Sequence, residues 1–333
     1  MSRVTVIFTG GTISMTVDPV AGGNVPTLDG AAILARTPGL EAIADVVPID
    51  LSRTPASHFT FPGLFEIAGI IRDAQADSTI DGVVVVQGTD TIEETAFLWD
   101  LVLDRPEPVV VTGAMRISTD PGFDGPRNIL DAVRAAAAPA LRDQGVLVVL
   151  DGSILAADAV TKTHASALDT FKSLDTGPVG SVGEGGVEIT RRRGPRRHVA
   201  TDRAADDVVL ITAHVAMDGS LLDAAARARP SGIVVEATGA GNTSAALLEA
   251  ATRSMAQGSV VVLTTRCPAG AASGAYAFQG GGATWVRAGA LLAGHLGGPK
   301  ARVALAVGLG AGLDRDALAA LVADPDGWHE GGG

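Results

Sequence analysis

Thr89 and Asp90 are the first residues of this sequence whose type and position could support chemistry. They follow Val83–Val86, a run of β-branched residues typical of a strand buried on both faces of a parallel sheet. Gly88 breaks that run, and apolar residues at helical spacing come after it. We therefore predict Thr89 and Asp90 at the carboxyl end of a strand and the start of a helix. Backbone N–H groups and the helix dipole favour an anion there, such as a substrate carboxylate. The alternative is an ordinary strand–helix loop, of which any α/β protein has several.

A second candidate is the glycine-rich turn Thr9–Ile13, which contains Thr12 and follows the strand-like run Val4–Phe8. Its paired glycines, Gly10 and Gly11, let the backbone turn sharply and leave room for a ligand. A nucleotide-binding loop would look similar. However, the turn lacks the G-x-G-x-x-G spacing and no lysine follows it, so neither the dinucleotide nor the P-loop fingerprint is met.

Lysine is scarce in this chain and occurs only as Lys162, Lys172 and Lys300. Lys162 closes the segment Asp158–Lys162, which comes after the strand-like run Val146–Leu150. The scarcity makes each lysine worth considering as a chemical group. A surface ion pair is the ordinary alternative for Lys162.

The elements that must position these residues alternate between strand and helix. This alternation predicts an α/β fold with a doubly wound, mostly parallel sheet. The predicted strands of the first half are Val4–Phe8, Val46–Leu51, Val83–Val86, Pro108–Thr112 and Val146–Leu150. Its predicted helices are Ala31–Ala44, interrupted near Pro38-Gly39, then Pro62–Ala76, the helix after Asp90, and Asn128–Ala137. The second half has predicted strands Val208–Thr212, Ile233–Ala237 and Ser259–Thr265 and predicted helices Leu221–Ala228, Asn242–Gln257, Lys300–Leu309 and Asp314–Ala323.

Two segments between these elements carry further predictions. The helix after Asp90 fits a capping box at its start, either Thr91 with Glu94 or Asp90 with Glu93. The stretch Asp18–Gly30 is rich in Gly, Pro and Asp, so we predict a long mobile loop there. Loops of that length in compact domains are often lids.

The basic run Arg191–Arg197 contains Gly194 and Pro195, which exclude regular structure through it. We interpret it as a solvated connector between two domains. The predicted organisation is a larger N-terminal α/β domain over residues 1–190, a linker over 191–207, and a smaller C-terminal α/β domain over 208–333.

Composition narrows the class of protein. The chain has 333 residues, of which 47% are apolar, but no apolar run reaches the ~18 residues that a membrane helix needs. Its net charge of −12 and pI near 4.9 argue against nucleic acid or an anionic membrane surface as partner. A single cysteine, Cys267, rules out an intramolecular disulfide and fits a reducing compartment. Met-Ser-Arg runs directly into the first strand and leaves no room for a signal peptide, so we expect a soluble, cytoplasmic protein.

Four stretches resemble the bacterial-type L-asparaginase (asparaginase/glutaminase) family in content, order and spacing. They are Thr9–Ile13, Gly88–Thr95, Thr112–Arg116 and Asp158–Lys162, and the later Gly239-Ala-Gly-Asn242 matches as well. The resemblance covers nearly the whole chain, from Val4 to the segment Lys300–Val303, and the first two motifs together are highly specific.

The resemblance implies two α/β domains and a homodimer or homotetramer, the tetramer being built from tight dimers. Each active site would lie between the N-terminal domain of one subunit and the C-terminal domain of its partner. The implied reaction is hydrolysis of the side-chain amide of L-asparagine to aspartate and ammonia, through an acyl-enzyme on threonine. The implied partner is a small-molecule amide, and neither a metal nor an organic cofactor is implied.

Particular residues match the family's catalytic positions. Thr12 matches the acyl-accepting threonine, and Thr89, Asp90 and Lys162 match a second catalytic cluster. A threonine hydroxyl is a weak nucleophile and needs a neighbouring base. A lysine can be that base only when burial and its neighbours leave it neutral, and a nearby carboxylate opposes this. Asp90 would then orient Lys162 or grip a substrate ammonium group. Backbone N–H groups near Thr89 and Ala114 are candidates for an oxyanion hole, where one lost donor costs ~10²-fold or more in rate.

The family's substrate-binding positions correspond less closely. The residues implied to bind substrate are Gly11, Ser57, His58, Gly88, Ala114, Asn242 and Tyr276. Ser57 and His58 stand where the family has the Ser-Gln pair that holds the substrate's α-carboxylate and α-ammonium groups. Gln87 stands where the family usually has histidine. The partner's usual acidic residue falls near Ala275–Ala277, where this chain has no carboxylate.

The family's lid tyrosine, which activates the first threonine, also has no counterpart in the lid segment Asn24–Pro26. The only tyrosine of the chain is Tyr276. We hypothesise that Tyr276 enters the neighbouring subunit's site and takes over part of the lid tyrosine's role. An ordinary interface tyrosine is the alternative.

These differences leave three functions open. The first is L-asparaginase itself, and the second is a related amidase for a different carboxamide, such as one that lacks a free α-amino group. The second follows because an ammonium group that is desolvated without compensation costs several kcal/mol. The third is a catalytically silent binding protein that kept the fold. Against the third, all four core polar residues Thr12, Thr89, Asp90 and Lys162 are present.

Overall fold

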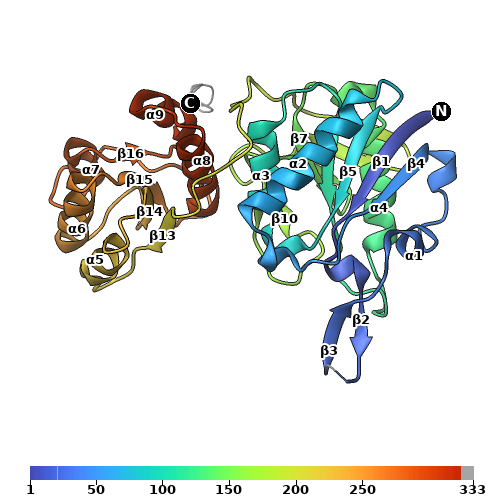
Figure 1. Cartoon of the computed structure of the whole chain (residues 1–333), viewed down its shortest axis with the longest axis horizontal. Helices are drawn as coiled ribbons and strands as arrows, with labels where there is room; N and C mark the ends of the chain where they lie inside the picture. The colour runs from blue at the N-terminus through green and yellow to red at the C-terminus, as the bar shows by residue number, and fades with distance from the viewer. Residues whose placement is uncertain (21, 324–333) are drawn as a thin grey trace. The chain divides into compact units, whose positions relative to one another are not determined.

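The computed structural model describes residues 1–20 and 22–323, and the chain divides into two units, Met1–His198 and the part from Val199 onward (Figure 1). Among the described residues, no helix is long and apolar enough to cross a membrane. The α/β fold class predicted from the sequence is confirmed in both units.

The first unit is built on one eight-stranded sheet. Its strands are β1 (Ser2–Phe8), β4 (Ala44–Asp50), β5 (Gly82–Val86), β6 (Val109–Thr112), β7 (Val146–Leu150), β8 (Ser153–Ala156), β11 (Gly180–Gly183) and β12 (Gly186–Ile189). They lie in the order β12-β11-β8-β7-β6-β5-β1-β4. The pairs from β7 to β4 are parallel, and the pairs that add β8, β11 and β12 are antiparallel. The sheet is therefore mixed, and its antiparallel edge was not predicted.

Helices cover both faces of this sheet. Helices α2 (Phe61–Ala76) and α3 (Ile92–Val102) lie on one face, and α4 (Gly125–Ala136) lies on the other (Figure 1). Val83–Val86 is fully buried, as its β-branched run predicted. Because the central strands are parallel, their carboxyl ends meet at one edge, where the loops after β1, β5 and β6 come together.

The interruption predicted near Pro38-Gly39 within Ala31–Ala44 is confirmed, but the predicted helical extent on both sides of it is wrong. Helix α1 covers only Gly30–Leu34, a short 3-10 turn follows at Leu40–Ala42, and Ala44 already belongs to β4. Gly39 adopts a left-handed conformation with φ of 94°, which interrupts the helical path.

The predicted loop Asp18–Gly30 is also wrong, because much of it is a β-hairpin. Strand β2 (Met15–Asp18) pairs antiparallel with β3 (Gly23–Pro26), and the hairpin projects from the body of the first unit (Figure 1). Asp29 then caps α1 by accepting a hydrogen bond from Ala32 N at 2.8 Å.

The basic run Arg191–Arg197 has no regular structure, as Gly194 and Pro195 predicted, but it is not simply a solvated connector. The Arg193 side chain is only 2% exposed, and its Nη2 lies 2.7 Å from Asp100 Oδ2 and 2.9 Å from Asp158 Oδ2. Burial lowers the pKa of the Arg193 guanidinium, but the charges of Asp100 and Asp158 outweigh burial and raise that pKa above its usual value. The prediction failed because both carboxylates are distant in sequence.

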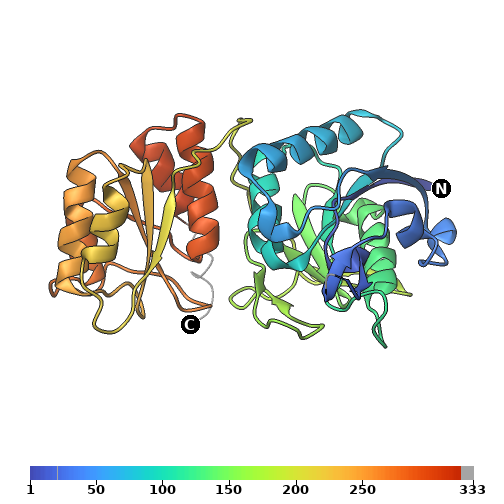
Figure 2. The same cartoon turned by 60° about the horizontal axis from the view of Figure 1, so that its bottom comes forward.

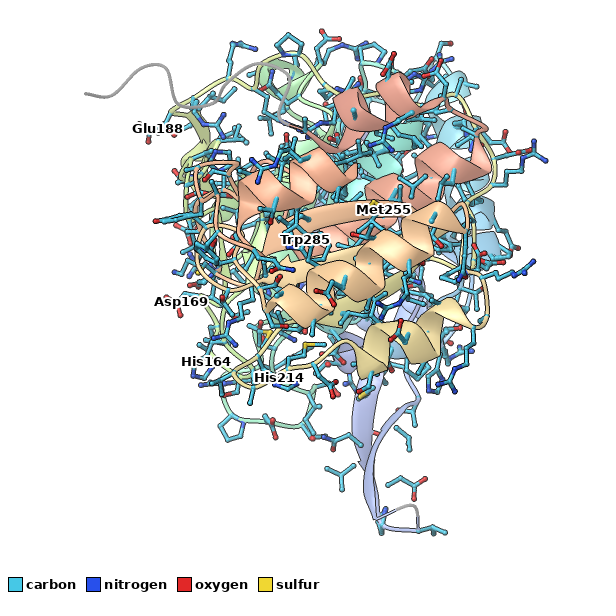
Figure 3. All side chains as sticks on the ribbon, turned by 90° about the vertical axis from the view of Figure 1, so that its left-hand side faces the viewer. His164, Asp169, Glu188, His214, Met255 and Trp285 are labelled. Atoms are coloured by element: carbon cyan, nitrogen blue, oxygen red, sulfur yellow. The ribbon has the colours of Figure 1, made fainter. Side chains whose placement is uncertain are left out.

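The second unit has a parallel four-stranded sheet, ordered β13 (Val209–Thr212), β14 (Gly232–Ala237), β15 (Val260–Thr265) and β16 (Leu291–Leu292). Its helices are α5 (Ser220–Ala226), α6 (Ala245–Ala256), α7 (Gly282–Ala288), α8 (Gly298–Gly310) and α9 (Arg315–Val322). Figure 2 shows α5, α6 and α7 on one face of this sheet and α8 on the other. Trp285 is fully buried in the core of this unit, and Met255 packs against the same core (Figure 3). Helix α7 and strand β16 were not predicted.

Candidate active site

Thr89, Asp90 and Lys162 form one hydrogen-bonded cluster in the first unit. Lys162 Nζ donates to Thr89 Oγ1 at 2.9 Å and lies 3.0 Å from Asp90 Oδ1. Thr89 is buried, the Lys162 side chain is 15% exposed, and the Asp90 side chain is 71% exposed. The cluster is therefore buried on the side of Thr89 and open to solvent on the side of Asp90.

The segment that carries Lys162 is fixed by two kinds of contact. Thr161 and Lys162 form the short strand β9 (Thr161–Lys162), which pairs antiparallel with β10 (Phe171–Lys172). The Thr161 hydroxyl donates to Glu93 Oε2 at 2.6 Å, which ties β9 to the first turn of α3. Because Thr89 and Asp90 lie just before α3, this bond joins the two segments of the cluster.

The predicted capping box at the start of α3 is wrong. Thr91 is the N-cap residue but makes no capping hydrogen bond, and its hydroxyl donates to Ala56 O at 3.2 Å. Asp90 lies in the preceding 3-10 turn (Thr89–Thr91) and accepts from Lys162, while Glu93 accepts from Thr161. The side chains that would have capped the helix instead hold neighbouring segments.

The turn that carries Thr12 packs directly against the Thr89 segment. Gly10 and Gly11 have φ of 109° and 89°, in the region that favours glycine. A Cβ added at Gly11 would lie 2.2 Å from the Cα of Gly88, so only glycine allows the two backbones to come this close. Thr12 then begins a 3-10 turn (Thr12–Ser14) and remains partly exposed.

Two further predicted segments adjoin Thr89. Ser57 and His58 are exposed and lie in the 3-10 turn Ala56–His58, whose Ala56 accepts the hydrogen bond from Thr91 described above. Ala114 is fully buried two residues after β6 ends, and a Cβ added at the preceding Gly113 would lie 3.1 Å from Thr89 Cγ2. The structure thus brings Thr12, Gly11, Ser57, His58, Gly88, Thr89, Asp90, Ala114 and Lys162 to one edge of the sheet.

Gln87, at the position before Gly88, is fully buried and has a structural role. Its Oε1 accepts from the Thr95 hydroxyl at 3.1 Å, and its Nε2 donates to Gly88 O at 3.3 Å. These bonds fix the backbone from which Thr89 projects. Within the described residues, no group of three or more His, Cys, Asp or Glu side chains is arranged to hold a metal ion.

Comparison with known protein families identifies the arrangement. Residues 3–194 match the model of the asparaginase N-terminal domain, and residues 207–322 match that of the glutaminase/asparaginase C-terminal domain. The chain belongs to the asparaginase family. The resemblance inferred from its motifs is confirmed.

Individual members of the asparaginase family align over most of the chain. A probable L-asparaginase of Deinococcus radiodurans is 37% identical over 325 residues, which cover 95% of this chain and 95% of that protein. L-asparaginase 2 of Bacillus subtilis is 34% identical over 80% of this chain and 73% of its own length. L-asparaginase 2 of Escherichia coli is 31% identical over 93% of this chain and 89% of its own length.

Asn242 and Tyr276, which the asparaginase resemblance implied as substrate-binding residues, belong to the second unit. Asn242 closes a small loop in which its carbonyl accepts from Thr238 Oγ1 at 2.8 Å, and its side-chain Oδ1 is buried without a hydrogen bond from the described residues. Tyr276 is 47% exposed, and its ring centroid lies 6.2 Å from that of Phe278. Their roles in binding stay predictions.

Sequence reasoning missed the side chains that support the cluster. Glu93 and Arg193 hold the Asp158–Lys162 segment, through Thr161 and Asp158 respectively. Asp158 and Thr161 both lie inside a motif that was singled out, so their polar side chains were a usable signal. Arg193 gave no such signal, because a basic run beside Gly and Pro is typical of exposed chain.

Proposed function

We propose that this chain is an asparaginase-type amidohydrolase that hydrolyses the side-chain amide of L-asparagine to aspartate and ammonia. The observation that carries the proposal is the contact of Lys162 Nζ with both Thr89 Oγ1 and Asp90 Oδ1 beside the Thr12 turn. Such a hydroxyl–lysine–carboxylate cluster next to a second hydroxyl suits covalent acyl transfer. A purely structural ion pair would not require the close contact between Gly11 and Gly88, which brings the Thr12 turn next to the Thr89 segment.

In the proposed reaction, Thr12 Oγ1 attacks the amide carbon and forms a tetrahedral intermediate. Backbone N–H groups near Thr89 and Ala114 stabilise the oxyanion. The C–N bond then breaks, and the nitrogen takes up the proton that Thr12 lost. Ammonia departs, and the acyl group remains bound to Thr12 as an ester. Water attacks this ester, the Thr12 oxygen regains a proton, and aspartate is released.

Thr89 is proposed to move protons in both halves of this reaction. Its oxygen accepts from Lys162 Nζ at 2.9 Å, so its own hydrogen can point to the substrate or to the attacking water. Asp90 holds Lys162 in place at 3.0 Å. The open side of the cluster at Asp90 is also a suitable place for a substrate ammonium group.

A second candidate is an amidase whose best substrate is a different small carboxamide. It is favoured by His58, which is exposed in the turn beside Thr91 where the family resemblance places a glutamine. A histidine that carries positive charge weakens binding of an α-ammonium group. A catalytically silent binding protein is disfavoured by the intact contacts of Lys162.

The test is ammonia release measured with L-asparagine, L-glutamine and carboxamides that lack the α-amino group. The proposal expects the highest kcat/KM for L-asparagine. A higher value for a carboxamide without the α-amino group would favour the second candidate. No ammonia from any of them would support the silent protein.

Assembly, location and domain division follow the family resemblance as further proposals. We propose a homodimer or homotetramer with sites shared between subunits, in which Asn242 and Tyr276 reach the partner's Thr12 site. We propose catalytic residues over 1–190, a linker over 191–207 and a C-terminal domain over 208–333. A cytoplasmic location is supported by the single cysteine, although one relative, from Haemophilus influenzae, is named a probable periplasmic L-asparaginase.

A further inference from the structure

The segment 113–126, which follows β6, contacts both threonine-bearing turns. On the Thr89 side, a Cβ added at Gly113 would lie 2.4 Å from Gln87 O and 3.1 Å from Thr89 Cγ2. The backbone at Gly113 is therefore packed directly against the Thr89 side chain. A shift of Gly113 toward Thr89 would press on the Thr89 methyl group and so disturb the orientation of the Thr89 hydroxyl.

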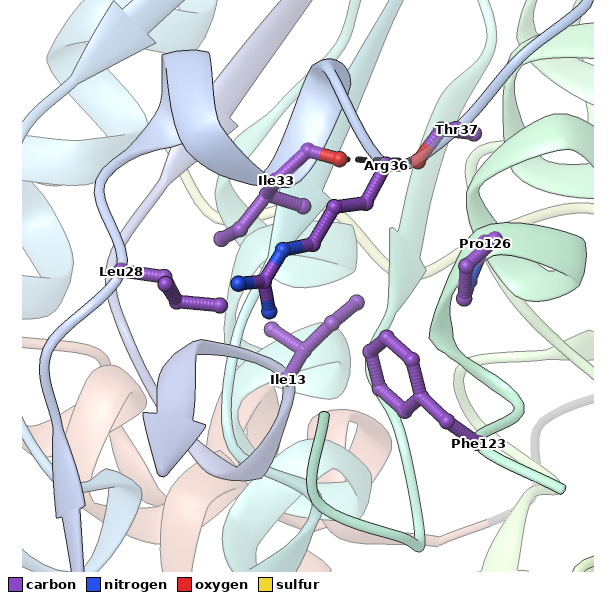
Figure 4. Close-up of a pocket in the computed structure, with 7 residues that line it drawn as sticks. All are labelled: Ile13, Leu28, Ile33, Arg36, Thr37, Phe123 and Pro126. Carbon is purple, nitrogen blue, oxygen red and sulfur yellow. Dashed lines mark hydrogen bonds between the residues drawn. The ribbon is translucent and has the colours of Figure 1, made fainter. Parts of the chain in front are cut away.

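On the Thr12 side, the same segment contacts the residues that follow Thr12. The Ser118 hydroxyl donates to Met15 O at 2.9 Å. A Cβ added at Gly125 would lie 2.9 Å from Ile13 Cγ1. Figure 4 shows Ile13 facing Phe123 across a small pocket that Leu28, Ile33, Arg36, Thr37 and Pro126 also line. Ile13 is the direct neighbour of Thr12, so this packing limits where Thr12 can lie.

Two polar side chains of α4 and its N-terminus hold this segment in place. Asp124 accepts from Met115 N through Oδ2 and from Arg116 N through Oδ1, each at 2.9 Å. Asn128 Nδ2 donates to Gly113 O and to Asp124 Oδ2, also at 2.9 Å each. We call these four bonds the Asp124–Asn128 lock. They fix the backbone on both sides of Ala114.

The lock is anchored to a third segment. Asn128 Oδ1 accepts from Asp151 N at 3.1 Å, just beyond β7. Asn128 therefore uses both of its amide hydrogens and its carbonyl oxygen in bonds. The residue is only 2% exposed, so water cannot replace a lost partner, and an alternative arrangement would leave buried polar groups unpaired.

We propose that Asp124 and Asn128 are positioning residues, which orient the Thr12 and Thr89 hydroxyls through segment 113–126. They touch neither of the two threonines and act through Gly113, Met115 and Arg116. The inference rests on the proposed amide hydrolysis for its activity readout. Loss of the lock lets Gly113 and Ala114 move relative to Thr89, and misplacement of about 1 Å can cost ~10²-fold in rate.

The chain offers a matched control at the opposite end of β6. Gln75, on α2, is also 2% exposed, and its Nε2 donates to Glu107 O at 2.9 Å, just before β6 begins. Gln75→Met and Asn128→Leu each replace a buried amide by an apolar side chain of similar size. Both remove a hydrogen bond to a backbone carbonyl beside the same strand. Only the bond lost in Asn128→Leu ends at Gly113, whose backbone packs against Thr89.

We expect both variants to lower Tm by a few degrees, but only Asn128→Leu to lower kcat, by about tenfold or more with KM changed less than about threefold. Asp124→Asn keeps one acceptor oxygen and should retain more kcat than Asp124→Ala. Equal kcat for Asn128→Leu and Gln75→Met, measured at a temperature where both are folded, would overturn the proposal. So would a loss confined to KM.

Hydrogen exchange separates failure of the lock from failure of the proposed function. The Met115 and Arg116 amides should exchange slowly in the wild type and faster in Asp124→Ala, whatever the protein hydrolyses. Unprotected wild-type amides would overturn the lock itself. Protected amides in a wild type that releases no ammonia from any amide would instead overturn the proposed function on which the positioning role rests.

Discussion

Two charged clusters of the first unit have similar composition but different surroundings. In the catalytic candidate, Lys162 contacts Thr89 and Asp90, and the Asp90 side chain is 71% exposed. In the other, Arg193 contacts Asp100 and Asp158, and Arg196 also contacts Asp100. The side chains of Arg193 and Asp100 are only 2% and 4% exposed. In each cluster, the cationic side chains and the oxygen atoms that they contact come from distant segments. Only the first is reachable by a substrate.

The cations suit these different surroundings. An arginine stays charged and uses a planar fork of donors, so a buried arginine between carboxylates is a fixed structural connection. A lysine is a single point of charge that can exchange a proton when its surroundings allow it. The clusters are linked, because Asp158 of the buried cluster and Lys162 of the open one lie in the same motif. The presence of charged residues therefore does not distinguish a catalytic cluster from a structural one, whereas exposure to solvent and substrate does.

The largest effect is expected at the buried cluster. Arg193→Met removes the buried guanidinium that contacts both Asp100 and Asp158, while Arg196 stays 3.3 Å from Asp100. Breaking a buried ion pair in this way costs about 3–5 kcal/mol of stability. Urea unfolding of this variant should show that loss. Arg192→Met, at the exposed neighbouring position, should change the free energy of unfolding by no more than about 0.5 kcal/mol. Equal stability for both would mean that the buried cluster does not stabilise the fold.

The next largest effect is expected on turnover and not on stability. Thr12→Ala and Thr89→Val should each lower amide hydrolysis by at least ~10²-fold, because each removes a hydroxyl that the proposed reaction uses. Size-exclusion chromatography should show that both variants keep the wild-type assembly. Near-full turnover by either variant would show that its threonine has no catalytic role.

Lys162→Met sharpens the contrast with Arg193→Met. It should remove most activity while leaving Tm nearly unchanged or higher, since an apolar side chain of similar volume often replaces a partly buried charge without loss. Calorimetry and the ammonia assay on one sample measure both quantities. Large destabilisation with activity retained would make the Lys162 cluster structural, like that of Arg193.

The smallest effect is expected in the second unit. Tyr276→Phe keeps the ring that packs near Phe278 and removes only the hydroxyl. If that hydroxyl reaches a neighbouring subunit's Thr12, kcat should fall about tenfold with the assembly intact. Unchanged kcat would leave Tyr276 as a packing residue and would confine the chemistry to the cluster of the first unit.

The sequence was sufficient to predict features set by neighbouring residues. The strand at Val83–Val86, the turn at Gly10 and Gly11 and the polar motif ending at Lys162 all depend on short patterns. Family resemblance then predicted that these segments belong to one site, and the contact between Lys162 and Thr89 fits that prediction.

The rest depends on partners that short patterns do not reveal. Arg193 is buried against Asp100, which lies 93 residues earlier in the chain. The residues next to Arg193 in the sequence instead predicted an exposed segment. The hairpin at Met15–Pro26 was not predicted, because the Gly, Pro and Asp content of this stretch is typical of loops. The capping box failed because tertiary partners were available to Thr91 and Glu93.

The most direct test of the account is to locate the covalent intermediate. The wild-type protein is mixed with L-asparagine, quenched in acid within the first turnovers, and digested for mass spectrometry. If Thr12 is the nucleophile, one aspartyl group should be found, as an ester, on the peptide that contains Thr12, and none in Thr12→Ala. An ester on the Thr89 peptide, or a Thr12→Ala variant that still releases ammonia at the wild-type rate, would contradict it.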